Sequence, residues 1–465
     1  MHFTDTNYAL FLPIVLLLYW GVRVRVAQNL ILLVASYAFY GWVHPWICIL
    51  IGVSTIVDYV CGLLLGRPDR RSVERRIVLG VSLAVNLGML GVFKYYNFFV
   101  SSAVDALSTL GVRSEPVMLY VLLPAGISFY TFQTLSYTID VYRGKLKARR
   151  SFLDFAVFVS CFPQLVAGPI ERARRLLPQI ESTRHWRWEF LESAIPLLVV
   201  GFFKKLVVAD NLAPFVQQVY MLEHPSAWVL FAGTVAFAIQ ILADFSAYTD
   251  IARGSSRLLG LDLMENFNAP YAALTPSDFW RRWHISLSTW IRDYVYIPLG
   301  GSHVSSRTKF VWIVAVTFGL SGLWHGAHWH FVVWGLFHAL LLIAYRAVGL
   351  DGRWKPSNRW RLVSSWTVMM TLTLLGWTLF RATSLGWLVE AVGHMSPGLT
   401  GNDLFVGTLI LGYCVVYSLP WLIVAALRRI RAPMYWTHVA CHWALVCLMV
   451  LLANREPEAF IYFQF

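Results

Sequence analysis

The chain is built from long apolar runs separated by short polar segments, a pattern typical of helices that cross a membrane. A helix needs about 20 mostly apolar residues to cross the hydrocarbon core of a bilayer. The pattern therefore predicts an all-α polytopic membrane protein with about 11–12 transmembrane helices. The predicted spans are 8–21, 28–43, 46–66, 77–100, 117–140, 191–209, 227–250, 309–329, 331–348, 362–380, 404–427 and 437–453.

Composition agrees with a membrane protein and excludes most alternatives. Hydrophobic residues make up 58% of the chain and charged residues 14%, whereas soluble domains carry about 25% charged residues. Too little polar surface is left to cover such a core in water, which excludes a soluble enzyme and a disordered chain. The 6 cysteines lie in apolar runs without CxxC spacing, so they indicate neither a disulfide framework nor a zinc site.

The formal net charge of +13 comes from clusters of Lys and Arg between the apolar runs, such as 143–150 and 172–187. The loops 210–226 and 384–403 are nearly free of these residues. Because cytoplasmic loops are enriched in Lys and Arg, the alternation predicts the basic loops inside and both termini outside. We therefore expect a lipid bilayer and no nucleic acid as partner, and no cleaved signal peptide at the N-terminus.

Two apolar stretches interrupt this alternation, 152–169 and 276–301. The first contains Pro163, Gly168 and Pro169, and the second mixes apolar side chains with several arginines. Irregular backbone at membrane depth is tolerated where it is buried in protein or lines a wet cavity. Both stretches are therefore interpreted as re-entrant or interfacial helices around a central chamber. The alternative is an amphipathic helix lying on the membrane surface.

Four histidines fall within fourteen residues of an apolar region, namely His325, His328, His330 and His338. Burial favours the neutral imidazole, which accepts a proton from a hydroxyl and so acts as a general base. The alternative for each is an interhelical hydrogen bond. His325 is the strongest candidate because Gly322 and Gly326 allow close approach of backbone or substrate. His328, three residues on, would face the same cavity on a continuous helix; a third ligand at fitting spacing is missing, so no metal is expected.

A second candidate site lies around His284, in the sequence DFWRRWHISLSTWIRDY. Arg281 and Arg282 suit the phosphates of an anionic donor such as a coenzyme; their alternative role is anchoring at the membrane edge. The tryptophans of this stretch belong either to an interfacial belt or to a pocket for a sugar or adenine ring, namely Trp280, Trp283 and Trp290. The chain contains no GxSxG, Walker A or GxGxxG motif in its required context. This absence argues against a serine hydrolase, a nucleotide hydrolase and a dinucleotide-dependent redox enzyme.

These segments resemble the membrane-bound O-acyltransferase family. The similarity lies in 244–301, in GLWHGAHWHFVVWG (322–335), in FPQLVAGPIER (162–172) and in FIYFQF (460–465). It is closest to the bacterial branch that contains alginate O-acetyltransferase and the D-alanyl transferase of teichoic acids. The resemblance implies a single membrane domain over 1–465 with a ring-like helical body and a thinned centre, and a catalytic segment at about 244–348. His325 would be the catalytic histidine and His284 its second histidine.

The resemblance also implies an activity. A donor on the cytoplasmic side, acetyl-CoA or another acetyl thioester, would supply an acetyl group, with no bound cofactor, for hydroxyls of an exported polysaccharide such as alginate. The transfer would be direct or through periplasmic acetyltransferase and accessory proteins, at the bacterial inner membrane. Ser321 and Trp324 are candidates for stabilising the oxyanion. Alternatives are D-alanyl transfer to teichoic acid and a non-enzymatic transporter of a lipid-linked or polymeric substrate.

Overall fold

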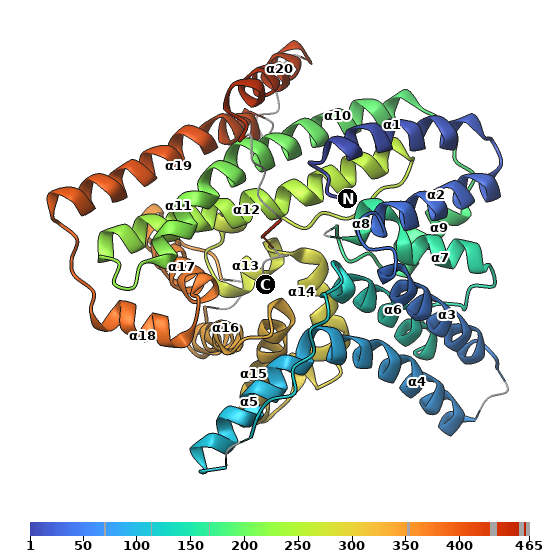
Figure 1. Cartoon of the computed structure of the whole chain (residues 1–465), viewed down its shortest axis with the longest axis horizontal. Helices are drawn as coiled ribbons and strands as arrows, with labels where there is room; N and C mark the ends of the chain where they lie inside the picture. The colour runs from blue at the N-terminus through green and yellow to red at the C-terminus, as the bar shows by residue number, and fades with distance from the viewer. Residues whose placement is uncertain are drawn as a thin grey trace. The chain divides into compact units, whose positions relative to one another are not determined.

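The computed structural model describes residues 1–68, 71–112, 114–166, 168–350, 354–427, 435–454 and 460–461. Within these ranges the regular elements are helices, and no strand occurs (Figure 1). The prediction of an all-α protein is therefore confirmed. The last four residues of the FIYFQF motif, 462–465, lie outside the described residues.

The chain divides into two compact units. The first comprises Met1–Ala194 and Ser255–Met264, and the second comprises Ile195–Gly254 and Glu265–Phe465. A single membrane domain over the whole chain stays a prediction.

The first unit holds the N-terminal helices. They are α1 (Thr6–Gly21), α2 (Arg25–Tyr40), α3 (Ile47–Leu65), α4 (Ser72–Leu90), a π-helical turn (Gly91–Tyr95), α5 (Tyr96–Thr109), α6 (Ile127–Tyr142), α7 (Phe152–Ser160), α8 (Phe162–Leu165) and α9 (Ala173–Glu181). The stretch 152–169 thus forms two short helices, α7 and α8, that meet at Cys161, in agreement with the predicted break.

Two buried carboxylates of the first unit have hydrogen-bond partners inside the protein. Asp154 accepts hydrogen bonds from Arg25 at 2.9 Å and from Asn29 at 2.7 Å. Glu171, which is fully buried, accepts a hydrogen bond from the backbone N–H of Met264 at 2.5 Å. Burial raises the pKa of the Glu171 carboxyl from 4.5 to about 7. Such pairing lowers the cost of placing polar groups inside an apolar body.

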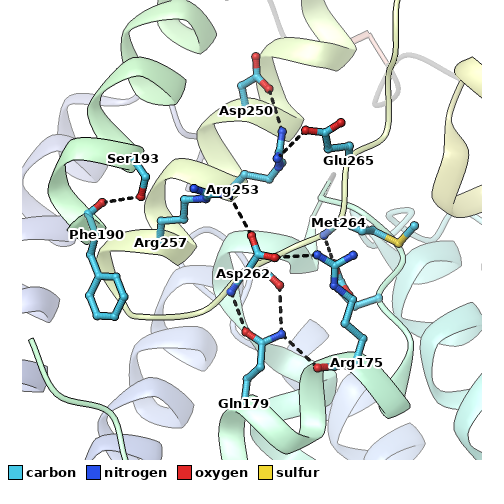
Figure 2. A network of polar contacts seen from close by, with 11 residues as sticks. Arg175, Gln179, Phe190, Ser193, Asp250, Arg253, Arg257, Asp262, Met264 and Glu265 are labelled. Atoms are coloured by element: carbon cyan, nitrogen blue, oxygen red, sulfur yellow. Dashed lines mark hydrogen bonds and ion pairs between the residues drawn. The ribbon is translucent and has the colours of Figure 1, made fainter. Parts of the chain in front are cut away.

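Figure 2 shows how the end of the long helix α12 (Ala227–Leu258) and the loop after it are held. In the first unit, Asp262 binds Arg257 at 3.1 Å and Arg175 at 2.8 Å. In the second unit, Arg253 binds Glu265 at 2.9 Å (Figure 2). Arg175, Arg253 and Arg257 therefore each form an ion pair with a carboxylate.

The second unit holds the remaining helices, of which α10 begins in the first unit. They are α10 (Trp188–Phe203), a π-helical turn (Lys204–Ala209), α11 (Asp210–Met221), α12, 3-10 turns at Pro270–Ala272 and Gly301–His303, α13 (Pro276–Arg282), α14 (Ile285–Ile291), a π-helical turn (Arg292–Tyr296), α15 (Arg307–His325), α16 (Trp329–Ala347), α17 (Arg359–Arg381), α18 (Leu385–Gly393), α19 (Gly401–Leu427) and α20 (Tyr435–Leu452).

Several helices have the length and composition of membrane spans. Among the described residues, six meet both criteria, and Thr6–Gly21 and Val439–Leu452 are shorter apolar helices. The six are Ile47–Leu65, Ser72–Thr109, Ala227–Leu258, Trp329–Ala347, Arg359–Arg381 and Gly401–Leu427. Each of the twelve predicted spans contains helix, and the multi-pass membrane character is confirmed.

Candidate active site

The candidate site is organised by a tight hairpin of α15 and α16, whose backbones approach at two glycines. A Cβ on Gly322 would lie 2.9 Å from the carbonyl carbon of Phe331, and one on Gly335 would lie 2.9 Å from the carbonyl carbon of Phe318. A side chain at either position would therefore push the helices apart. Gly326 follows α15 in an extended conformation (φ −162°, ψ 150°), and the helix ends at His325.

His325 lies at this C-terminal end of α15 and is 3% exposed. Aromatic rings surround its imidazole: the ring centroids of Trp324 and Trp334 are each 5.0 Å away, and that of Phe380 on α17 is 5.4 Å away. The edge-to-face arrangement of all three fixes the plane of the imidazole. The histidine is thus held at the junction of α15, α16 and α17.

His284 lies in the predicted second irregular stretch, between α13 and α14. Its backbone adopts the left-handed conformation (φ 42°, ψ 57°), which non-glycine residues rarely adopt. Asn266 holds the turn, because its carbonyl oxygen accepts from the N–H of Ile285 at 2.9 Å and its side-chain oxygen accepts from that of Ser286 at 3.2 Å. Strained conformations of this kind persist where the surrounding structure enforces them, often at functional sites.

The two histidines contact one indole ring, that of Trp324. The centroid of Trp324 is 5.0 Å from that of His325 and 5.8 Å from that of His284. His284 is fully buried and also contacts Phe245 of α12 at 4.6 Å. Burial lowers the pKa of His284 from 6.5 to about 3, so its imidazole is neutral at pH 7. Phe245 in turn contacts Phe460, at 5.8 Å, next to the C-terminus.

A cavity of about 710 Å³ opens beside this histidine pair. It combines three arginines with aromatic and hydroxyl side chains, among them Arg281, Arg292, Arg346, Trp280, Tyr296, Ser288 and Thr317. Its lining extends to Ser321, one helical turn before His325 on α15. The guanidinium of Arg346 lies over the ring of Phe310, 4.0 Å from its centroid. Cations and flat rings in one cavity suit an anionic ligand with a planar group.

The structure separates residues that are adjacent in the sequence. Arg281 and Arg282 both bind Asp278, at 3.7 Å and at 3.0 Å, but Arg281 lines the cavity and Arg282 is not among the lining residues. Trp280 also lines it, whereas Trp283 is 1% exposed and stacks on Phe279 at 5.7 Å. Successive residues of a helix point about 100° apart, so one face of α13 meets the cavity and the other meets the core.

His328 lies outside α15, because the helix ends at His325. Its side chain is exposed and stacks on His330 with a centroid distance of 5.5 Å. The expectation that His325 and His328 face one cavity assumed a continuous helix, which the structure does not have. Within the described ranges, no group of three His, Cys, Asp or Glu side chains has a geometry that would hold a metal ion.

Three residues of this site were not proposed for it from the sequence: Arg292, Arg346 and Asn266. Arg346 follows an apolar run and has the pattern of a residue at a membrane edge. Arg292 begins a π-helical turn, an element that is frequent at functional sites. From the sequence alone, neither feature distinguishes an arginine that lines a cavity from one that anchors the protein at the membrane edge.

The helical membrane fold agrees with the comparison to known proteins. The model of the MBOAT, membrane-bound O-acyltransferase family, matches residues 145–350. A probable alginate O-acetylase of Azotobacter vinelandii is 40% identical over 420 residues, which cover 88% of this chain and 82% of that protein. The chain therefore belongs to the membrane-bound O-acyltransferase family and is an O-acyltransferase.

Two further relatives show the range of acceptors in the family. A peptidoglycan O-acetyltransferase of Helicobacter pylori is 33% identical over 85% of this chain and 79% of its own length. A teichoic acid D-alanyltransferase of Bacillus subtilis is 29% identical over 55% of this chain and 68% of its own length. Membership of this family of enzymes argues against the non-enzymatic transporter considered above.

Proposed function

We propose that the protein moves an acetyl group from a cytoplasmic thioester, acetyl-CoA, to hydroxyls of an exported polysaccharide of the alginate type. The transfer takes place at the bacterial inner membrane and is direct or passes through periplasmic acetyltransferase and accessory proteins. The observation that carries the proposal is the buried pair His325 and His284 around Trp324, next to a cavity rich in arginine.

The position of the cavity supports a donor from the cytoplasm. It lies at the end of the α15–α16 hairpin that carries Arg307, Lys309 and Arg346. Basic residues gather at cytoplasmic membrane edges. Arg281, Arg292 and Arg346 would bind the phosphates of the donor, and Trp280 would pack against its adenine ring. The thioester then reaches Ser321 and the last turn of α15.

In the transfer step, His325 acts as the general base. Its neutral imidazole takes the proton of the acceptor hydroxyl while that oxygen forms a bond to the thioester carbonyl carbon. The tetrahedral intermediate carries its negative charge on the former carbonyl oxygen, which the indole N–H of Trp324 and the hydroxyl of Ser321 stabilise. The C–S bond then breaks, and the proton passes from His325 to the leaving thiolate. His284, which also contacts Trp324, orients the reacting groups.

The proposal is tested with His325→Ala and His325→Gln in the purified full-length protein in lipid nanodiscs. A positioned base contributes about 10²–10⁴-fold in rate, so both variants should lose acetyl transfer from acetyl-CoA by that factor. His394→Ala is the control, since His394 is exposed and its imidazole binds Glu390 at 3.2 Å. Acetyl transfer at the wild-type rate by well-folded His325→Gln would remove His325 from the catalytic role.

A further inference from the structure

A second cavity, of about 320 Å³, lies in the same unit as the donor cavity. Its lining residues come from α11, α12, the end of α17 and Ile461: Ala213, Val216, Gln217, Tyr220, Met221, Gln240, Arg381, Thr383 and Ile461. The volume equals that of about ten water molecules, which leaves room for a single sugar ring.

The arginines Arg346 and Arg381, one from each cavity, lie at opposite ends of the α16–α17 pair. The start of α16 packs on the end of α17, as the ring contact of Phe331 with Phe380 at 4.9 Å shows. Arg346 of the donor cavity is fifteen residues further along α16, about 22 Å away at 1.5 Å per residue. The chain leaves Arg381 toward 384–403, a loop nearly free of Lys and Arg and so expected outside. By this predicted topology, the second cavity is expected on the acceptor side.

Arg381 is the charged residue of this second cavity. Its guanidinium carbon is 5.4 Å from the ring centroid of Tyr220. Among the residues that the structure describes, no carboxylate forms an ion pair with it. It follows Phe380, whose ring contacts His325 at 5.4 Å. A half-buried arginine inside a membrane protein is costly without an anion, and such residues usually serve a function.

Gln240 on α12 gives a second, independent indication of a ligand. Its side chain is 8% exposed, and its buried Oε1 has no hydrogen-bond partner within the described part of the chain. Buried polar atoms are nearly always hydrogen-bonded. A positive charge at the end of a helix would explain Arg381 alone through the helix dipole. It does not explain an unsatisfied amide lining the same cavity.

We propose that this cavity binds an acidic sugar unit of the acceptor, with Arg381 on its carboxylate and the Gln240 amide on one of its hydroxyls. The planar guanidinium matches the two oxygens of a carboxylate. One uncompensated arginine balances one negative charge per sugar, as in a uronic acid. The inference rests on the proposed transfer, and it adds which chemical group of the acceptor is recognised.

The test measures binding to the purified full-length protein in nanodiscs without any donor. The probes are a trisaccharide of uronic acid units and the same trisaccharide with its carboxylates reduced to alcohols. The variants are Arg381→Gln and Gln240→Leu. The matched control is Arg359→Gln, which removes an exposed arginine at the other end of α17.

Wild-type protein should bind the acidic probe about 10- to 100-fold more tightly than the reduced probe, as expected for a charge-assisted hydrogen bond. Arg381→Gln should lose that preference and leave binding of the reduced probe unchanged. Gln240→Leu should weaken the binding of both probes by about 2- to 10-fold. Arg359→Gln should bind like wild type.

Equal binding of both probes by wild type, or a preference that survives Arg381→Gln, would overturn the inference. A failure of the proposed function gives a different result. In that case wild type would prefer the acidic probe as predicted, yet acetyl-CoA would not be consumed when both are present. Tighter binding of a glycerol phosphate oligomer than of the acidic trisaccharide would also overturn the assignment and favour a teichoic acid acceptor.

Discussion

The close approach of α15 and α16 at Gly322 predicts how much stability and activity the variant Gly322→Ala loses. The added Cβ would lie closer than 3.0 Å to the carbonyl carbon of Phe331, whereas ordinary contacts begin at 3.4 Å. The two atoms nearest to this Cβ are the carbonyl oxygen and carbon of Phe331, which belong to rigid helical backbone. The two helices must therefore separate by about 1 Å. Overpacking of this size costs about 1–3 kcal/mol of stability.

The same displacement acts on the catalytic geometry. His325 follows Gly322 by three residues, and Trp334 of the facing helix packs on its ring. A misplacement of about 1 Å can cost about 10²-fold in rate. Gly322→Ala should therefore lower acetyl transfer by about that factor. Gly335→Ala, which introduces the same clash from α16, should behave alike.

Gly319→Ala is the matched control, one turn earlier on α15. The nearest atom to a Cβ there is Cδ2 of Leu336, at 3.9 Å, so the methyl group fits. Alanine also favours helix over glycine by about 1 kcal/mol, and this variant should be at least as stable as wild type and fully active. The measurements are thermal unfolding in detergent and acetyl transfer in nanodiscs. If Gly322→Ala has the stability and rate of Gly319→Ala, the close approach of α15 and α16 at Gly322 does not hold the catalytic geometry.

Two more predictions concern charge. The double variant Arg281→Gln, Arg346→Gln should raise the Kd for acetyl-CoA by about 10-fold or more in equilibrium binding. The control Arg359→Gln should leave the Kd unchanged. An unchanged Kd in the double variant would mean that both arginines only anchor the protein at the membrane edge. Glu171 has a pKa of about 7 in the folded protein against 4.5 as its ordinary value, so the stability it contributes is complete below pH 4.5 and is lost as the pH rises through 7. The free energy of unfolding should fall by roughly 3 kcal/mol from pH 4.5 to 8 relative to Glu171→Gln, and parallel pH curves for the two proteins would contradict this.

Local sequence was sufficient for much of the fold. Apolar length predicts the membrane helices, because each helix satisfies its own backbone hydrogen bonds and needs only lipid or protein around it. The breaks in 152–169 and 276–301 follow from proline, glycine and charge within apolar runs, and both stretches indeed form short helices. The resemblance to O-acyltransferases likewise rested on contiguous motifs, and family membership is confirmed.

Which of these residues come into contact depends on how the helices pack. His284 and His325 are 41 positions apart, and their common contact with Trp324 depends on how α14 and α15 pack. The sequence treats Arg281 and Arg282 alike, and both bind Asp278, yet only Arg281 lines the cavity, because neighbours on a helix point in different directions. Helix formation depends on residues that are close together along the chain. A cavity is bounded by faces of several helices, and the local sequence pattern does not determine how these helices pack.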